Sequence, residues 1–253
     1  MIQEIPSVAV KNNIVYKLGN EIITSFDVNE QFKYLLAFNL NLKQIEEREQ
    51  FKISLSSLIQ EKIKKIELLN TYKNLKIDDE YKKKLITRTY TMLGHSNILD
   101  FKNYLETYNL KIEDIEEKIT VEALWNEIII KKFSKEIKIN TIELKKRIES
   151  SSNVKNKSYL LSEIFIEIKR KDQIEINYNK ILKSIEDVGF ENTASIYSIS
   201  DSSKFGGSIG WVEEKSLSKT LKLKLSSLKK LGLSDFIALP GGFLILKIND
   251  IKF

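Results

Sequence analysis

Cysteine is absent from this chain of 253 residues, and histidine occurs once, as His95. The lack of cysteine excludes a disulfide framework, a thiol nucleophile and a zinc–thiolate site. One histidine among scattered carboxylates does not supply the several converging ligands that a metal ion needs, so neither a metal nor another cofactor is expected. His95 is predicted to face solvent or to cap a helix, because it lies in the interhelical turn LGHSN.

Long apolar runs and a secretory leader are also missing. No apolar run reaches the ~18 residues that a bilayer-spanning helix requires, so no membrane insertion is expected. The N-terminal stretch MIQEIPSVAV has no basic segment followed by an apolar one, so no signal peptide is recognised in it. The chain is therefore expected to be either a cytoplasmic protein or the processed form of an exported one.

The net charge of +6 and the pI near 9.1 favour an acidic partner such as nucleic acid. The basic residues, however, alternate with acidic ones in EEREQFK, IDDEYKKK and IEDIEEK. Opposite charges one helical turn apart are typical of solvated helix faces. No nucleic-acid partner is therefore expected, and a basic scaffold that binds nucleic acid or ribosomes stays an alternative that rests on charge alone.

A small β-hairpin is predicted near the N-terminus. Short β-rich stretches at 8–10, 14–18 and 21–23 are separated by dipeptides typical of turns. Thr24 precedes Asp27 by three residues, which is the spacing of a capping box, so a helix is expected to begin there.

The residues that follow have helical periodicity, because apolar side chains recur every three or four positions. The predicted helices lie near 46–73, 98–107, 112–132 and 140–150, with one more capped by Asp78 or Asp79. In the longest helix one buried stripe is expected, made of Leu55, Leu58, Ile59, Ile63, Ile66 and Leu69. Trp125 and Trp211 sit on apolar faces and are predicted to lie in the core.

The segment SSSNVKNKS (150–158) interrupts this pattern with small polar residues. The prediction is a first domain at 1–150, a linker at 151–157 and a second domain at 158–253. In the second domain the pattern changes to the order β-α-α-β-α-β-β. Its predicted elements are a strand at 159–168, helices at 176–188 and 190–198, a strand at GWV, a helix at 218–230, and two strands within 233–250.

The stretch KFGGSIGWVEE (204–214) contains three glycines ahead of its tryptophan. No helix begins directly after them and no Lys-Ser or Lys-Thr pair follows, so a phosphate-binding loop is not indicated. Gly206, Gly207 and Gly210 are predicted to form a tight turn and a strand that packs beneath a neighbouring backbone.

Several local motifs of the second domain occur in one order. GFENTASIYS (189–198) has the pattern G-x-F-x-x-x-A-x-x-Y-S with the aromatic displaced by one residue, and SDSSKFGGSIGW (200–211) combines an acidic residue, paired glycines and a Gly-Trp strand. LSSLKKLGLSD and GGFLILKIND supply a closing helix and a final strand. In these features residues 158–253 resemble the parvulin family of peptidyl-prolyl isomerases, which implies an antiparallel sheet with surrounding helices.

The first domain carries a second resemblance. KLGNEIITSFDV is similar to a hairpin followed by an I-T-x-x-D-V helix start, and LIQEKIKKIELLNTYKNLKIDDEYKKKL to a long helix with a basic link and an acidic cap. In both, residues 8–150 resemble the N-terminal chaperone domain of SurA-type periplasmic foldases. The expected fold class is therefore α+β: a helical chaperone domain with a small β-hairpin, followed by one parvulin-like domain.

The parvulin resemblance also implies a site. Parvulins carry two histidines and a cysteine or aspartate beside an apolar proline pocket, and the resemblance places Glu163 and Leu244 at the histidine positions and Asp201 at the acidic one. It places Leu217 and Leu221 in the pocket, as substrate-binding residues. Leu244 can neither donate nor accept a hydrogen bond, so the isomerase site is predicted to be degenerate, with the pocket retained as a peptide-binding groove.

The two resemblances together imply a periplasmic chaperone that binds unfolded outer-membrane or secreted proteins, its signal peptide removed. The helical domain is the expected main binding surface, and the parvulin-like domain is expected to be a weak or inactive enzyme. The alternative is an active peptidyl-prolyl cis-trans isomerase with an altered polar cluster.

The expected oligomeric state is a monomer or a dimer paired through the hairpin. In SurA-type proteins a C-terminal segment returns to pack on the N-terminal part, whereas this sequence ends at Phe253, after the last predicted strand. The hairpin at 8–23 is therefore expected to have an open edge. Such an edge recruits a strand from a second copy or from an extended client.

Overall fold

The computed structural model describes residues 12–134, 157–167 and 174–253. The chain forms two compact units, Met1–Glu127 and Ile128–Phe253. Helices with small antiparallel sheets make up both, so the α+β prediction is confirmed. The domain end predicted at 150 and the helix predicted at 140–150 lie outside the described residues. The strand predicted at 8–10 and all of the predicted linker except Lys157 lie outside them as well.

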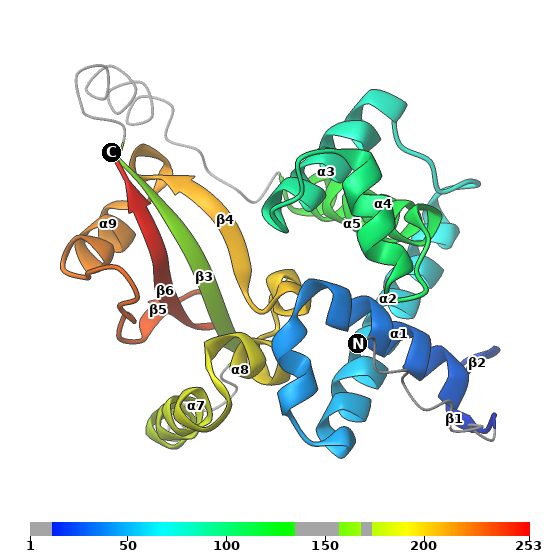
Figure 1. Cartoon of the computed structure of the whole chain (residues 1–253), viewed down its shortest axis with the longest axis horizontal. Helices are drawn as coiled ribbons and strands as arrows, with labels where there is room; N and C mark the ends of the chain where they lie inside the picture. Colours follow the sequence, from blue (N-terminus) through cyan, green and yellow to red (C-terminus); the bar gives the residue numbers. More distant parts are fainter. Residues whose placement is uncertain (1–11, 135–156, 168–173) are drawn as a thin grey trace. The chain divides into compact units, whose positions relative to one another are not determined.

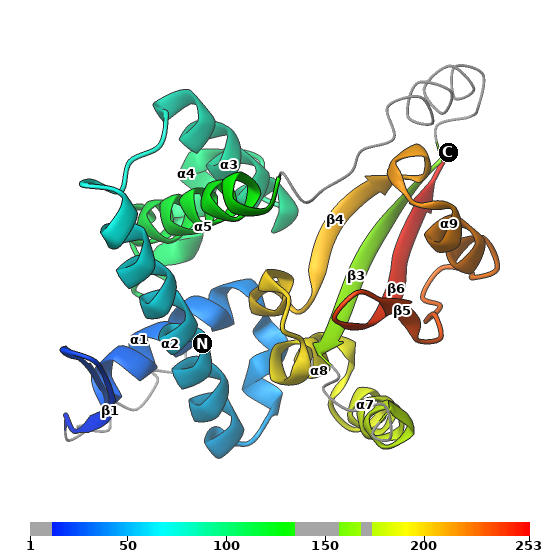
Figure 2. The ribbon, with the colours of Figure 1, turned by 180° about the vertical axis from the view of Figure 1, so that it is seen from behind.

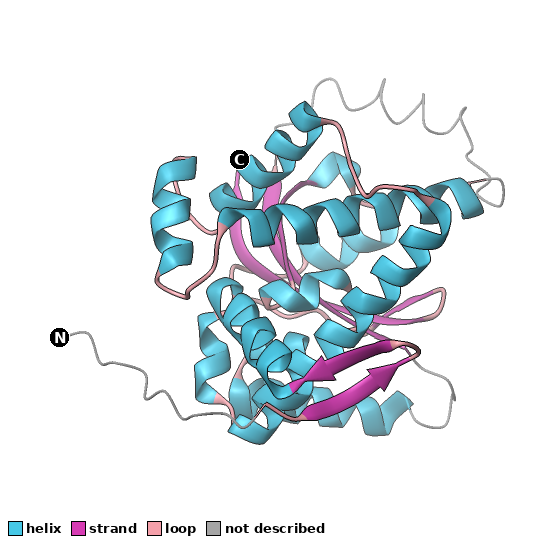
Figure 3. Ribbon diagram, turned by 90° about the vertical axis from the view of Figure 1, so that its right-hand side faces the viewer, coloured by secondary structure: helices cyan, strands magenta, loops and turns pink. Residues whose placement is uncertain are grey.

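The N-terminal unit begins with the predicted hairpin, formed by β1 (Ile14–Leu18) and β2 (Glu21–Thr24). Figure 3 shows the two strands side by side as an antiparallel pair. The predicted capping box is confirmed: Thr24 Oγ1 accepts a hydrogen bond from the Asp27 amide, and the Asp27 carboxylate accepts one from the Thr24 amide at 2.8 Å. The side chains thus satisfy backbone donors that the first helical turn leaves without partners.

Five α-helices and one 3-10 helix follow in this described region. They are α1 (Ser25–Phe38), η1 (Leu40–Gln44), α2 (Glu47–Thr71), α3 (Asp79–Met92), α4 (Ile98–Glu106) and α5 (Ile112–Phe133). Their bounds confirm the helices predicted near 46–73, 98–107 and 112–132. Asp78 caps α3, since its carboxylate accepts a hydrogen bond from the Tyr81 amide at 2.9 Å. Figure 2 shows α3, α4 and α5 gathered as one group of helices.

The single buried stripe predicted for α2 is wrong in the C-terminal half of that helix. Ile63, Ile66 and Leu69 are 47%, 37% and 53% exposed. The buried side of this half instead carries Lys64 and Leu68. In the N-terminal half the prediction holds, because Leu55, Leu58 and Ile59 pack against Val15, Ile23 and Val28 of the hairpin and α1. The sequence periodicity predicted an apolar face on α2. It did not predict where along the helix the hairpin and α1 stop covering that face.

The helices α1, α2 and α5 meet around a set of polar side chains, called here the polar centre: Gln31, Tyr34, Ser57, Glu61 and Lys118. The Lys118 ammonium donates hydrogen bonds to Gln31 Oε1 at 2.9 Å and to the Glu61 carboxylate at 2.5 Å. Gln31 in turn donates to Ser57 Oγ at 3.0 Å. The Lys118 ammonium also lies 4.6 Å from the centroid of the Tyr34 ring. Burial, followed by the charge of Glu61, raises the pKa of the Tyr34 hydroxyl.

Two aromatic predictions need correction. His95 does not simply face solvent, because its ring packs 4.6 Å from the Tyr104 ring and 5.7 Å from the Phe101 ring. Trp211 does not lie in the core: it is 44% exposed, and the Lys252 ammonium lies 4.3 Å from its ring centroid. A flat aromatic face beside a lysine is stable at the surface through cation–π attraction.

The C-terminal unit is built on one antiparallel sheet with the strand order β4-β3-β6-β5, visible in Figure 1. The strands are β3 (Ser158–Glu167), β4 (Ser208–Glu213), β5 (Ile237–Leu239) and β6 (Gly242–Lys252). The helices are α7 (Ile174–Val188), α8 (Phe190–Tyr197) and α9 (Lys219–Ser226), with 3-10 turns η3 (Asp201–Phe205) and η4 (Glu214–Ser216). The predicted element order is confirmed. α9 is shorter than predicted, ending where the Ser226 and Ser227 hydroxyls bond back to the preceding turn.

Each face of the sheet packs against different helices. Ile164 and Ile245 point to one face, where they pack with Ile181 of α7 and with Phe190 and Ala194 of α8. The other face carries the second cluster, called here the apolar floor: Tyr159, Leu161, Leu217, Leu225, Ile237, Leu244, Leu246 and Ile248. Leu225 belongs to α9, so α9 covers this second face.

No helix within the described ranges is both long and apolar enough to cross a membrane.

Candidate functional site

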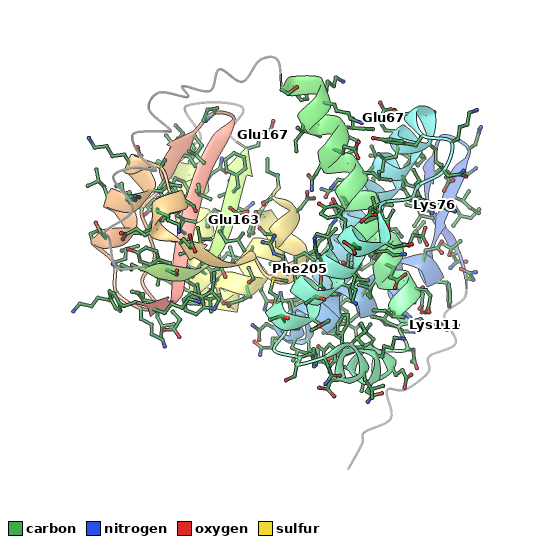
Figure 4. All side chains as sticks on the ribbon, turned by 90° about the horizontal axis from the view of Figure 1, so that it is seen from above. Glu67, Lys76, Lys111, Glu163, Glu167 and Phe205 are labelled. Atoms are coloured by element: carbon green, nitrogen blue, oxygen red, sulfur yellow. The ribbon has the colours of Figure 1, made fainter. Side chains whose placement is uncertain are left out.

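Glu163 lies midway along β3, as Figure 4 shows, and is paired in register with Leu246 of β6. Directly opposite residues of an antiparallel pair point to the same face. The Glu163 side chain therefore points to the face of the sheet that carries the apolar floor. It is half-buried.

Two serine hydroxyls hold the Glu163 carboxylate. Ser200 Oγ donates to Glu163 Oε1 at 2.5 Å and Ser202 Oγ donates to the same oxygen at 3.0 Å. Ser202 Oγ also lies 3.1 Å from Ser200 Oγ, so its single proton can be donated to either Glu163 or Ser200. Within the part of the chain that the structure describes, Glu163 makes no ion pair, so hydroxyl donors are what stabilise its charge.

Asp201, which lies between the two serines in the sequence, forms an ion pair. Its side chain is 51% exposed, and its carboxylate lies 4.0 Å from the ammonium of Lys204. The serines on either side of it reach Glu163 instead. The sequence interpretation placed Asp201 at the site and missed Ser200 and Ser202, although the run SDSS offered the signal: hydroxyls on both sides of the acidic residue.

Leu244, Leu217 and Leu221 come together, as the sequence interpretation expected. Leu244 and Leu217 are both 6% exposed members of the apolar floor, and the half-buried Leu221 packs against it. Leu244 is paired in register with Phe165, which also packs against the floor. Both positions therefore belong to one buried cluster, in which their own side chains make apolar contacts.

The glycine turn brings the serines to Glu163. Gly207 has φ +81°, and a Cβ added to it would lie 2.3 Å from the Glu163 carbonyl oxygen. The Glu163 amide donates to the Gly207 carbonyl at 2.8 Å. Gly206, with φ +60°, ends η3 in the left-handed conformation. The predicted tight turn and close approach are confirmed at 206 and 207, where no side chain larger than hydrogen fits at 207, but not at Gly210, where an added Cβ meets nothing within 4 Å.

The arrangement places a carboxylate that accepts hydrogen bonds beside the buried side chains of the apolar floor. It holds no imidazole, because the chain's one histidine is His95 of the N-terminal unit. Neither Leu244 nor an ionised Glu163 can donate a hydrogen bond. Across 12–134, 157–167 and 174–253, no three His, Asp or Glu side chains converge as metal ligands.

Comparison with known proteins gives one family. Residues 164–250 match the family of PPIC-type PPIASE domains, the rotamases. No curated protein matches the chain by sequence.

Solved structures of this kind cover different shares of the chain. A PpiC-type peptidyl-prolyl cis-trans isomerase domain is 28% identical and covers 38% of this chain and 93% of its own, with a TM-score of 0.35. PrsA from Bacillus subtilis is 18% identical, covering 94% of this chain and 77% of its own (TM-score 0.33). A structure of SurA-like chaperones from Campylobacter jejuni is 17% identical, covering 95% and 83% (TM-score 0.34).

Proposed function

Residues 164–250 form a PpiC-type peptidyl-prolyl isomerase domain, and from this premise we propose that the chain is a chaperone that binds unfolded polypeptides while this domain contributes little isomerase activity. The proposed clients are unfolded outer-membrane or secreted proteins, met in the periplasm. The helical unit provides the main binding surface, and the PpiC-type domain a secondary one.

The low isomerase activity follows from the chemistry of the site. Rotation about an X–Pro bond crosses a barrier of roughly 18–20 kcal/mol, and an isomerase lowers it by binding the twisted amide better than the planar forms. A site that does so needs polar groups arranged around the rotating carbonyl. Here Leu244 presents only carbon and Glu163 is already held by two serine hydroxyls. Such a site can bind a proline without favouring its twisted amide.

The observation that carries the chaperone proposal is an exposed apolar row on α2. Ile63, Ile66 and Leu69, called here the α2 stripe, follow one another at three-residue steps on one side of the helix. The row begins beside Lys62, whose ammonium pairs with Glu21 of the hairpin at 2.8 Å. The hairpin covers the preceding turns and leaves these uncovered. Exposed contiguous apolar side chains of this kind mark binding surfaces.

Replacing all three residues of the α2 stripe by serine is expected to weaken binding of an unfolded client at least tenfold. Each replacement removes an apolar contact of about 1 kcal/mol, so tenfold is a lower bound for three. Client affinity is measured by fluorescence anisotropy of a labelled, permanently unfolded polypeptide, and chaperone activity by the suppression of client aggregation.

The matched control replaces three exposed apolar residues outside the stripe by serine: Leu40, Leu99 and Ile130, which are 54%, 64% and 64% exposed. This control variant loses a similar apolar area and is expected to keep its client affinity within about twofold. Equal losses in both variants, or an unchanged affinity in the stripe variant, would contradict the proposed surface.

The hairpin is proposed as a second contact for extended segments. Among the described residues, β1 and β2 pair only with each other, so each has an open edge. An open edge offers backbone donors and acceptors to another strand, from a client or from a second copy of the chain. The proposed oligomeric state is accordingly a monomer or an edge-paired dimer.

Addition of a client is expected to slow hydrogen exchange of the amides in 14–18 by about tenfold or more, because a recruited strand protects them. Exchange is followed by mass spectrometry with and without the client. Light scattering from micromolar to millimolar concentration checks self-pairing in parallel. A monomer at every concentration, with no client-dependent protection of the hairpin, would rule out both forms of pairing.

A further inference from the structure

The segment around α9 differs in charge from the rest of the chain. Residues 215–234, KSLSKTLKLKLSSLKKLGLS, contain six lysines and no aspartate or glutamate. The chain's other lysine-rich stretches, such as IDDEYKKK, contain acidic residues as well. This local excess of positive charge is therefore not explained by the composition of the chain.

Half of these lysines are neutralised in the structure and half are not. Lys215, Lys224 and Lys230 form ion pairs with Glu213, Asp235 and Asp250 at 2.9, 3.4 and 2.9 Å. Lys219, Lys222 and Lys229 make no ion pair with any residue in the described ranges. Lys219 and Lys229 are exposed, and Lys222 is half-buried. Three lysines thus retain uncompensated charge within one short segment.

Lys219 and Lys222 belong to α9, and Lys229 follows three residues after that helix ends. Its buried side carries Leu225, which is fully buried in the apolar floor, and the partly buried Leu221. Lys219 and Leu223 are four positions apart and share the exposed side, whereas Lys222 is half-buried at its edge. Leu223 is 65% exposed, so α9 presents an apolar side chain to solvent one helical turn from Lys219.

Leu231 places a second leucine in solvent by an unusual backbone conformation. It is 66% exposed and has φ +67°, in the left-handed region, where its amide donates to the Ile248 carbonyl at 2.7 Å. Glycine adopts this conformation without strain, and leucine does not. A strained residue that exposes an apolar side chain indicates that the side chain has a role outside folding.

We infer that Lys219, Lys222, Lys229, Leu223 and Leu231, called here the lysine–leucine surface, bind an anionic phospholipid bilayer. Lysines at a membrane surface place their ammonium groups among anionic headgroups, while neighbouring leucines enter the boundary with the acyl chains. The chemistry of the segment favours a bilayer over nucleic acid. Residues 212–235 contain no arginine and no aromatic side chain for bidentate phosphate contacts or base stacking.

Vesicle flotation tests this surface with the full chain. Vesicles that contain one third phosphatidylglycerol are expected to bind the protein at least tenfold more strongly than vesicles of phosphatidylcholine alone. Changing Lys219, Lys222 and Lys229 together to glutamine is expected to remove most of that difference. A matched control changes Lys73, Lys76 and Lys111, exposed lysines of the N-terminal unit, to glutamine and so alters the net charge equally.

The leucines separate a bilayer from other anionic partners. Leu223→Ser combined with Leu231→Gly is expected to lower vesicle binding at least fivefold, while Leu231→Gly alone raises thermal stability because glycine relieves the backbone strain. No binding to anionic vesicles, or equal losses in the lysine variant and its control, would overturn the inference. It would also be overturned if the leucine variant bound vesicles like the wild type while the lysine variant did not, since the surface would then recognise anionic charge alone, which nucleic acid or an acidic protein also supplies.

Discussion

Gly207→Ala is expected to lower the free energy of unfolding of the C-terminal unit by about 3 kcal/mol or more. The added Cβ would lie 2.3 Å from the Glu163 carbonyl oxygen and 3.0 Å from the Ala194 Cβ, and the backbone has φ +81°. The carbonyl belongs to the central strand β3 and cannot retreat without breaking sheet hydrogen bonds. Native-state hydrogen exchange of the β3 and β6 amides in the full chain measures the free energy of unfolding of this unit separately from that of the N-terminal unit.

Gly210→Ala is the control for backbone strain alone. Gly210 has φ +77°, yet a Cβ there meets nothing within 4 Å. Its replacement is expected to cost about 1 kcal/mol, which is the usual cost of an alanine in the left-handed region. If both substitutions lower the free energy of unfolding equally, the close approach of Gly207 to Glu163 adds no cost beyond backbone strain.

Lys118→Met is expected to destabilise the N-terminal unit by about 2–3 kcal/mol. The substitution leaves the Glu61 carboxylate without its cation and Gln31 Oε1 without its donor, and both lie where α1, α2 and α5 meet. The Lys118 and Glu61 side chains are 18% and 19% exposed, so water replaces the lost contacts only in part. Chemical denaturation, monitored by hydrogen exchange of the α2 and α5 amides, measures the loss of unfolding free energy.

Lys52→Met is the matched control, since Lys52 pairs with Glu49 on the surface and its side chain is 54% exposed. Exposed pairs of this kind contribute about 0–1 kcal/mol. The double variant Lys118→Met with Glu61→Met is expected to recover at least half of the loss, because it leaves no unpaired charge. If Lys118→Met lowers the free energy of unfolding no more than Lys52→Met does, the polar centre does not stabilise the N-terminal unit as proposed.

Local chemistry made much of the fold predictable. The capping box of Thr24 and Asp27 and the sequence of strands and helices after residue 158 depend on neighbouring residues, and the structure reproduces both. The cover of α2 was not predictable in the same way. Its apolar face extends from Leu55 to Leu69, but only the hairpin's position decides that Leu58 is buried and Leu69 is not. Tertiary contact, rather than periodicity, sets that boundary.

In the candidate site, too, local sequence motifs predicted some residues and tertiary contacts determined the others. Motif spacing placed Glu163 and Leu244, and the register of β3 and β6 puts both on the face of the apolar floor. Ser200 and Ser202 were missed because their hydroxyls reach Glu163 only through the η3 turn, which Gly207 holds against β3. A sequence states which residues flank Asp201 but not which of the three side chains turns inward.

The most direct measurement compares prolyl isomerisation and client binding in one preparation. A protease-coupled assay on a proline tetrapeptide is run at the protein concentrations that suppress aggregation of an unfolded client. The account predicts suppression of aggregation together with an isomerisation rate within about twofold of the uncatalysed rate, which is a barrier change below about 0.5 kcal/mol. A rate enhancement of about a hundredfold or more that is lost in Glu163→Gln would contradict it, and would identify the carboxylate and its two serines as a working isomerase site.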